Sequence, residues 1–290
     1  NKKPKSKTKS LQSKEIYIDE SMDNDIKSTL KDKKIVGIDP GLCDLIYCVD
    51  GTAKDANKFR YSKDKSINEV KSNKYAMIIN EKKKQHVIDG KSIIEYETEL
   101  SHYNRKTLNI EKFKEYCLKK NQLNSNIFGF YEDRLFRKLK LNGYWNRQRS
   151  EQLMINRFKE KFGSKEETII AFGDFEQKKH MKYKEPIKGK GMRTLFRKNG
   201  YKTFLVDEFR TSCKCSACEG GSCEKFLYRK SPKPKSSLMN DDLPERLVHG
   251  LLKCKTCGEY WNRDVNGAKN IYKIAYSIIQ GLERPMYLRR

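Results

Sequence analysis

Four cysteines of this 290-residue chain have the spacing of metal ligands. They form two C-x2-C pairs, Cys215 with Cys218 and Cys254 with Cys257. Each short knuckle directs two thiolates at one ion, and two knuckles together provide the tetrahedral thiolate set that zinc prefers. The spacing therefore predicts a structural Zn²⁺ ion in a four-cysteine ribbon with a long insert between its knuckles. The alternative is that these residues are only reduced thiols.

The other cysteines have less distinctive positions. Cys213 would form an unusual C-x-C knuckle and Cys223 has no near partner, so we interpret both as spare thiols. Cys43, Cys48 and Cys117 are expected to be small core residues. An odd total of nine cysteines, clustered late in the chain, favours metal binding in a reducing compartment over disulfide bonds.

Three carboxylates stand at the expected ends of elements that could bring them together. Asp39 closes an apolar strand before Pro-Gly, Glu208 lies near the end of another apolar strand, and Asp264 stands where a helix begins. Sites in open α/β sheets gather beyond the carboxyl ends of the strands, so we expect these side chains to converge. Carboxylate oxygens suit Mg²⁺, and two such ions would activate water and stabilise the leaving oxygen of a phosphodiester.

Two of these carboxylates also have an ordinary structural interpretation. An aspartate before Pro-Gly, such as Asp39, commonly forms a turn. An aspartate that opens a helix, such as Asp264, commonly caps it. Their combination at expected strand ends of a strongly basic chain favours the metal site.

The charge of the chain indicates the partner. Lys and Arg number 63 against 38 Asp and Glu, which gives a net charge of +25 and a surface that attracts polyanions. Sixteen tyrosines and thirteen phenylalanines are available to stack on bases. We therefore expect a nucleic-acid partner rather than a membrane surface or a merely soluble basic protein. No run of 18 apolar residues and no secretory signal is present, so no transmembrane helix is expected.

The elements that must position these residues can be placed along the chain. Residues 1–33 are interpreted as a basic and polar linker or tail of a missing amino-terminal part, since the chain opens with Asn1. A helical block is expected at about 64–163; its Arg and Lys faces either line a nucleic-acid channel or are solvated. The class is α/β, with strands predicted at 34–39, 45–49, 58–62, 168–175 and 202–209 and further helices at 192–198 and 268–279.

Three motifs carry a family resemblance. Residues 35–41, Ile-Val-Gly-Ile-Asp-Pro-Gly, resemble the first motif of RuvC-like nucleases. Thr211-Ser212, the two cysteine knuckles and the block Asn-Arg-Asp-Val-Asn-Gly-Ala-Lys-Asn-Ile at 262–271 look like the zinc ribbon and third motif of transposon-encoded TnpB nucleases. Those proteins share ancestry with type V CRISPR effectors. The resemblance implies an RNase H-like fold, with a mixed five-stranded sheet, a helical insertion before the fourth strand and a ribbon before the last helix.

The resemblance also bears on the middle carboxylate, by which we mean the second of the three catalytic acids in chain order. TnpB proteins usually carry a glutamate where this chain has Gly173. Their eukaryotic and giant-virus relatives, called Fanzor, are similar in lacking it and use a glutamate on the following strand. This comparison implies Glu208 as the middle ligand, with Asp174 as its rival and Glu176 as a weaker third.

The function implied by the resemblance is RNA-guided cleavage of DNA by a RuvC-type, two-metal-ion hydrolase. Its partners would be a guide RNA and target DNA, bound by a monomer in an intracellular compartment, nuclear or at a viral factory. The implied divisions are a nuclease core at 34–210, the zinc ribbon at 211–262 and the last helix with a tail at 263–290. The alternatives are a decayed zinc-ribbon nucleic-acid-binding protein and an unguided RuvC-like resolvase.

Overall fold

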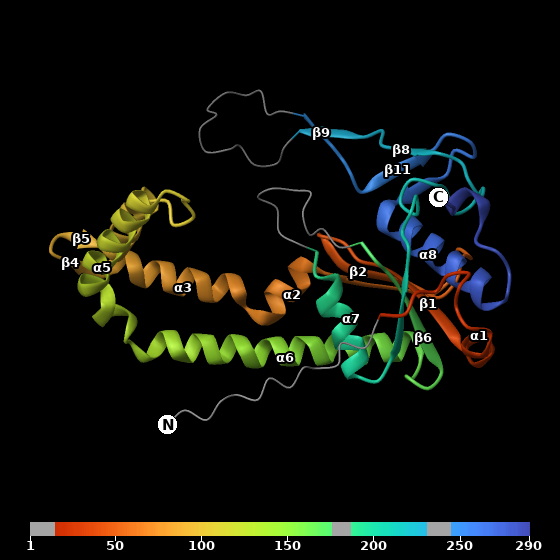
Figure 1. Cartoon of the computed structure of the whole chain (residues 1–290), viewed down its shortest axis with the longest axis horizontal. Coiled ribbons are helices and arrows are strands. Elements are labelled where there is room, and N and C mark those ends of the chain that lie inside the picture. The colour runs from red at the N-terminus through yellow and green to blue at the C-terminus, as the bar shows by residue number, and fades with distance from the viewer. Residues whose placement is uncertain (1–14, 176–186, 231–244) are drawn as a thin grey trace. The chain divides into compact units, whose positions relative to one another are not determined.

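A computed structural model describes residues 15–175, 187–230 and 245–290. The chain divides into two compact units. The first, which we call the sheet unit, comprises residues 1–63 and 153–290, and the second, the helical unit, comprises residues 64–152 (Figure 1). No helix among the described residues has the length and apolar character needed to cross a bilayer.

The sheet unit is built on a mixed five-stranded sheet in the order β3-β2-β1-β6-β7. Strand β1 runs antiparallel to β2, which runs antiparallel to β3, whereas β1, β6 and β7 are mutually parallel. The expected mixed five-stranded α/β architecture is therefore confirmed. The strands are β1 (Lys34–Asp39), β2 (Asp44–Val49), β3 (Lys58–Ser62), β6 (Thr168–Gly173) and β7 (Lys202–Val206).

The parallel strands are nearly continuous apolar runs because helices cover both faces of the sheet. On one face, the end of α6 (Arg134–Phe162) and α7 (Gly189–Lys198) contribute Met154, Phe158 and Phe196 to the core. On the other face, α1 (Asn24–Leu30) and α8 (Arg263–Ile279) contribute apolar side chains to a second cluster.

Two strands are shorter than the sequence predicts. Strand β6 ends at Gly173 and β7 at Val206, not at 175 and 209. The carboxylates that follow, Asp174 and Asp207, are not fully buried and accept hydrogen bonds outside the sheet. Because a charged side chain is costly to bury without a partner, these residues lie outside the part of the sheet that helices cover on both faces. Glu208 therefore lies beyond its strand.

The prediction of a linker at residues 1–33 is wrong for residues 15–33. Ile18, Met22 and Leu30 are buried in the second core cluster. The chain before α1 also extends the sheet edge at Leu205, whose amide donates to the Ile16 carbonyl at 2.9 Å and whose carbonyl accepts from the Ile18 amide at 2.8 Å. Residues 1–14 lie outside the described part of the chain.

The helical unit accounts for most of the block expected at 64–163. The turn at Asp89-Gly90 has positive φ at both residues and joins the two strands of a short hairpin. The next helix begins with a capping box between Ser92 and Glu95, a strong local start signal. The elements are α2 (Lys63–Val70), α3 (Ser72–Gln85), β4 (Val87–Ile88), β5 (Lys91–Ser92), α4 (Ile93–Ser101), α5 (Ile110–Tyr131) and most of α6.

Helix α8 lies on β1 without an intervening side chain. A methyl group added at Gly37 would stand 2.6 Å from the Ala268 carbonyl oxygen and 2.7 Å from the Tyr272 amide nitrogen. Such distances are inside van der Waals contact, so only glycine permits this approach. Gly37 therefore fixes the spacing between the sheet and α8.

We predict that Gly37→Ala lowers the free energy of unfolding by about 1–3 kcal/mol, because α8 must move away from β1. Gly191→Ala is the matched control, since a methyl there would meet no atom of the described residues within 4 Å and alanine favours the helix. Denaturant titration measures both. Equal stability of the two variants would contradict the close contact.

Candidate active site

Asp39 is the buried member of a group of three carboxylates. It is the last residue of β1 and is only 7% exposed. Its carboxylate lies against Gly267 of α8, where an added methyl would stand 2.3 Å from Asp39 Oδ2. Burial, and then the negative charges of Glu208 and Asp264, raise the pKa of Asp39 well above its ordinary value. Both predicted partners therefore lie close enough to Asp39 for their charges to act on it.

Glu208 reaches back from the end of β7 over the end of β6. A methyl at Gly173 would stand 1.7 Å from Glu208 Oε1 and 2.5 Å from Cδ. The Phe175 amide donates to Oε1 at 3.4 Å. Burial is the main reason that the pKa of Glu208 rises to about 8. The carboxylate of Glu208 thus occupies the space that a side chain at Gly173 would need.

Asp264 is placed by the start of α8. Asn262 caps this helix, accepting hydrogen bonds from the amides of Asp264 at 2.9 Å and Val265 at 3.2 Å. Asp264 is therefore not the N-cap, and its carboxylate lies near Gly41 in the turn after β1. Burial, followed by the charge of Asp44, raises its pKa.

The rival carboxylate, Asp174, has a different environment. Its Oδ2 accepts a hydrogen bond from the Tyr17 hydroxyl at 3.3 Å, and its Oδ1 accepts from the Glu208 amide at 3.3 Å. Asp174 therefore holds the backbone that carries Glu208. Glu176 lies outside the described residues.

The structure places three further charged residues near the site that were not predicted as site residues from the sequence: Arg263, Asp44 and Arg60. The positive charge of Arg263 opposes the raised pKa of Asp39, Glu208 and Asp264 alike. Asp44, 7% exposed, is paired with Arg60 at 3.1 Å. The only signal for Arg263 is its position before Asp264, whereas Asp44 and Arg60 become neighbours of the site through the pairing of β2 with β3.

The carboxylates provide the donors that a hard divalent cation requires. Within the described ranges, no hydrogen bond or ion pair involves the carboxylate of Asp39 or Asp264, so their oxygens are available as ligands. Three neighbouring acids with raised pKa values favour a cation among them. The arrangement is looser than the thiol site, because among described residues only cysteines gather three or more ligand atoms within 4.8 Å. The donor set fits Mg²⁺.

The four predicted zinc ligands come together as one cluster. Cys215 Sγ lies 3.7 Å from Cys257 Sγ, and Cys218 Sγ lies 3.6 Å from Cys254 Sγ. Tetrahedral zinc with Zn–S bonds of about 2.3 Å needs sulfurs about 3.8 Å apart. Burial and the neighbouring thiols raise the pKa of Cys218 to about 12, which a bound cation would reverse. The cluster can therefore bind zinc.

The ribbon that carries these thiols consists of short strands. One sheet has the order β12-β11-β8, and a separate hairpin pairs β9 with β10. A methyl at Gly221 would stand 2.6 Å from the sulfurs of both Cys218 and Cys254, so this glycine leaves room for the cluster. The strands are β8 (Cys223–Glu224), β9 (Tyr228–Lys230), β10 (Glu245–Leu247), β11 (Leu251–Cys254) and β12 (Tyr260–Asn262).

The remaining cysteines lie outside this cluster. Cys213 and Cys223 are not part of the four-thiol group among the described residues. Cys48 is fully buried in the core, as predicted. The core assignment is wrong for Cys43, which is exposed in the turn between β1 and β2, and Cys117 is only half-buried on α5.

Two fully buried asparagines join the ribbon to α8. Asn266 donates to the Lys214 carbonyl at 2.7 Å and accepts from the Ser216 amide at 2.9 Å. Asn270, one turn later, donates to the carbonyls of Thr211 and Lys214, both at 2.8 Å. The helix that carries Asp264 therefore also holds the base of the ribbon.

Trp261 makes a second link between the cluster and the sheet. Its indole N–H donates to Cys215 Sγ at 3.2 Å. The ammonium of Lys269 lies 5.2 Å from the center of the Trp261 ring and donates to the Thr52 carbonyl at 2.9 Å. A zinc ligand, α8 and the turn between β2 and β3 are thus connected.

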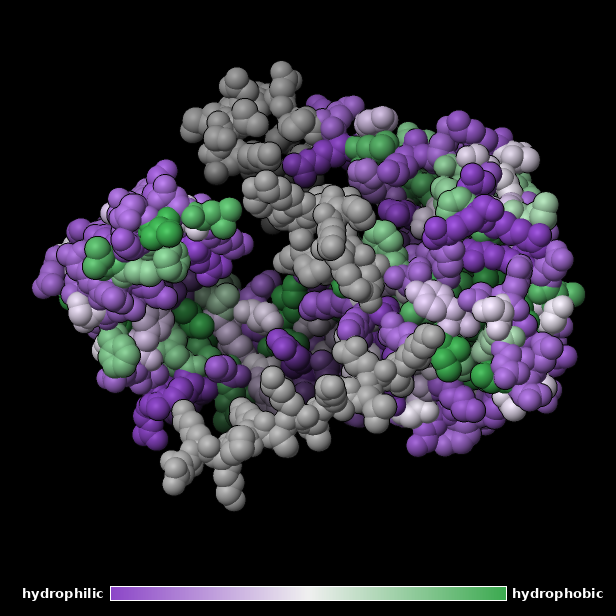
Figure 2. Space-filling model, viewed as in Figure 1, coloured by the Kyte–Doolittle hydropathy of each residue, from purple (hydrophilic) through white to green (hydrophobic). Residues whose placement is uncertain are grey.

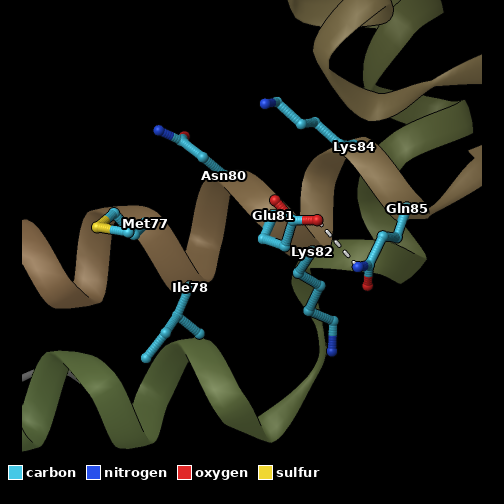
Figure 3. Close-up of a pocket in the computed structure, with 7 residues that line it drawn as sticks. All are labelled: Met77, Ile78, Asn80, Glu81, Lys82, Lys84 and Gln85. Atoms are coloured by element: carbon cyan, nitrogen blue, oxygen red, sulfur yellow. Dashed lines mark hydrogen bonds between the residues drawn. The ribbon is translucent and has the colours of Figure 1, made fainter.

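A surface hollow along α3 is unrelated to these groups (Figure 3). Its polar groups have local partners, since Gln85 donates to Glu81 at 3.0 Å and Lys82 is paired with Asp133. No convergent acids line it, so it is not a second catalytic candidate. Its lining is Met77, Ile78, Asn80, Glu81, Lys82, Lys84 and Gln85.

Residues 193–271 match the family model described as Cas12f1-like, TNB domain. This segment contains the end of α7, all of β7, the four-cysteine ribbon and the first half of α8. The chain is thus similar to a Cas12-type protein over the ribbon and the Asp264 motif.

A solved structure also resembles the chain. It is the cryo-EM structure of CasPhi-2 (Cas12j) bound to crRNA and phosphorothioate-DNA, at 13% identity and a TM-score of 0.45. The match covers 92% of this chain and 48% of that chain, so this chain spans about half its length. No curated protein matches the chain.

We predict that the purified protein carries one zinc ion per chain and that Cys254→Ser abolishes zinc retention. The serine hydroxyl is a poor zinc ligand, and Cys254 is one of the four thiols that form the cluster among the described residues. Elemental analysis measures the stoichiometry. Cys213→Ser is the control and keeps its zinc; zinc retained by Cys254→Ser would contradict the ligand set.

Proposed function

We propose that the chain is the nuclease part of an RNA-guided DNA endonuclease of the TnpB/Cas12 kind. One observation carries the proposal: the carboxylate of Glu208 fills the space over Gly173, and its charge acts on Asp39 together with that of Asp264. A buried acid at the end of β1 and two half-buried acids, one beyond the end of β7 and one at the start of α8, are suited to metal-dependent phosphodiester hydrolysis. The Cas12f1-like match over 193–271 supports this reaction class.

The residues of the site have distinct tasks in this proposal. The charges of both Glu208 and Asp264 act on Asp39, so in this proposal Asp39 shares a metal ion with each of them. Gly173 and Gly267 keep other side chains away from these carboxylates. Arg263 supplies a positive charge at the site and is suited to hold a phosphate beside it. Bound Mg²⁺ would supply activation of water and stabilisation of the leaving oxygen.

The proposed variant within the TnpB/Cas12 kind follows the sequence resemblance. A glutamate beyond β7, in place of one at Gly173, favours the Fanzor-like variant of the family over ordinary TnpB. We propose that a bound guide RNA pairs with the target strand and so selects the DNA that is cut. The net charge of +25 supports contact with two nucleic acids. Nuclear or viral-factory localisation and a monomeric state belong to the same proposal.

A second function is a decayed nucleic-acid-binding protein that keeps its ribbon. The loose spacing of the carboxylates, compared with the thiols, favours this alternative. The position of Glu208 argues against decay, because its half-buried carboxylate occupies a space that only glycine at 173 leaves open. Activity decides between the two.

We predict that Asp39→Asn, Glu208→Gln and Asp264→Asn each lower DNA cleavage by about a thousandfold, or ~4 kcal/mol, because each removes a charged ligand. The substrate is a plasmid that carries a sequence complementary to the RNA copurified with the full-length protein, assayed with Mg²⁺. Binding of this RNA should change little.

Asp207→Asn is the matched control for these variants. It is the chain neighbour of Glu208, but its carboxylate is paired with Arg290 at 2.9 Å. Cleavage by this variant should stay near the wild-type rate. Full activity of Asp264→Asn would overturn the site, and an inactive wild type that still binds RNA would establish the decayed alternative.

A further inference from the structure

Helix α6 has one face that carries only positive charge. Between Asp133 and Glu151 the chain contains six cations and no acid, over nearly five helical turns. All six are exposed. We call the solvent-facing side of this segment the α6 cationic face; its cations are Arg134, Arg137, Lys138, Lys140, Arg147 and Arg149.

The opposite side of α6 packs within the helical unit. Leu139, Gly143, Asn146 and Ser150 follow each other at intervals of four, three and four residues and are buried or half-buried. Asn146 donates to the Tyr75 hydroxyl at 3.0 Å, which ties this side to α3. The cationic face therefore points away from the helices on which α6 packs.

Large apolar side chains stand among the cations of this face. Leu141 and Tyr144 are each 56% exposed, and Trp145 is 61% exposed. The rings of Tyr144 and Trp145 contact each other edge-on, with centroids 5.5 Å apart. One turn before them is Lys140, and one turn after them is Arg149. Aromatic rings between cations are the arrangement that binds nucleic-acid strands.

The charges of this face are not neutralised by the protein. On the other helices and the hairpin of the helical unit, five lysines form ion pairs with Asp or Glu, namely Lys82, Lys83, Lys91, Lys114 and Lys119. No ion pair is recorded for any of the six cations of α6 within the described part of the chain. Hydrophilic residues predominate on the face of the molecule shown in Figure 2. The positive charge is thus available to an external polyanion.

We propose that the α6 cationic face binds a single strand of DNA, with Trp145 and Tyr144 stacked on bases and the flanking cations on phosphates. The charge of this face favours a polyanion over a protein partner. Nearly five turns without an acid would repel the basic groups of a protein surface and would offer them no carboxylate to pair with. Exposed rings select an unpaired strand, because the bases of a duplex are already stacked on each other. The choice of DNA rests on the proposed nuclease function.

A comparison of α6 with α5, in the same helical unit, supports α6 as the binding face. Helix α5 also exposes apolar side chains, including Phe113 at 46% and Leu118 at 72%. There, Glu111 and Glu115 stand beside them. Carboxylates in that position would repel phosphates, so α5 serves as the internal negative control for α6.

The experiment measures binding of a fluorescein-labelled DNA strand of about 16 nucleotides by anisotropy, without added Mg²⁺. Trp145→Ala should weaken binding about tenfold or more, and Trp145→Phe, which keeps a ring, should stay close to the wild type. Unlabelled strand should quench the tryptophan fluorescence of the wild type but not the Trp261 emission that remains in Trp145→Phe. Phe113→Ala on α5 should change nothing.

A second measurement tests the cations. Arg147→Gln with Arg149→Gln should reduce the slope of log affinity against log salt by about 1.4, at ~0.7 per phosphate contact. The charge-matched control, Lys112→Gln with Lys114→Gln, should change the slope much less, since Lys114 is already paired with Glu111. Circular dichroism confirms that each variant is folded.

Wild-type affinity in Trp145→Ala, or equal losses in the α5 controls, would overturn the proposal. Tighter binding of an RNA strand or of duplex DNA, dependent on Trp145, would overturn the choice of single-stranded DNA. Binding is measured without cleavage, so an inactive nuclease that still shows these effects would refute the proposed function alone.

Discussion

The site depends on the direct contact between α8 and β1. Because Gly37 has no side chain, the backbone of α8 approaches the strand that ends in Asp39. The same helix starts with Asp264, places Gly267 over Asp39 and holds the ribbon through Asn266 and Asn270. Loss of this contact would separate two of the three carboxylates and detach the zinc cluster from the sheet.

The second constraint is the shared space of Gly173 and Glu208. Strands β6 and β7 are parallel neighbours, with Gly173 opposite Val206, so a side chain two residues beyond β7 can fold back over the end of β6. A glycine at one strand end and a glutamate after the next are therefore one structural feature. Asp174 supports it by accepting a hydrogen bond from the Glu208 amide.

The sequence predicted those parts of the molecule that depend on local patterns. Apolar runs and turn residues located the strands, and the C-x2-C spacing located all four thiols of the cluster. It did not reveal the packing of residues 15–33. Ile18 and Met22 are isolated apolar residues in a polar segment, and their burial depends on contacts with the distant elements of the second core cluster. Nor did the sequence reveal Asp44 as a neighbour of the site, because the charge of Asp44 acts on Asp264 only through long-range packing, which leaves no periodic signal. For Arg263 the only signal was its position before Asp264. Strand ends were placed too late because the carboxylates that end β6 and β7 were read as part of the strands.

The most direct test of the account exchanges the two positions that share one space. Glu208→Ala alone should be inactive, whereas Gly173→Glu combined with Glu208→Ala should return DNA cleavage to within about tenfold of the wild type, or ~1.4 kcal/mol. The new carboxylate would start from β6 and end where that of Glu208 lies now. A double variant that is folded, binds its RNA and stays as inactive as Glu208→Ala would contradict the assignment of Glu208 as the middle carboxylate.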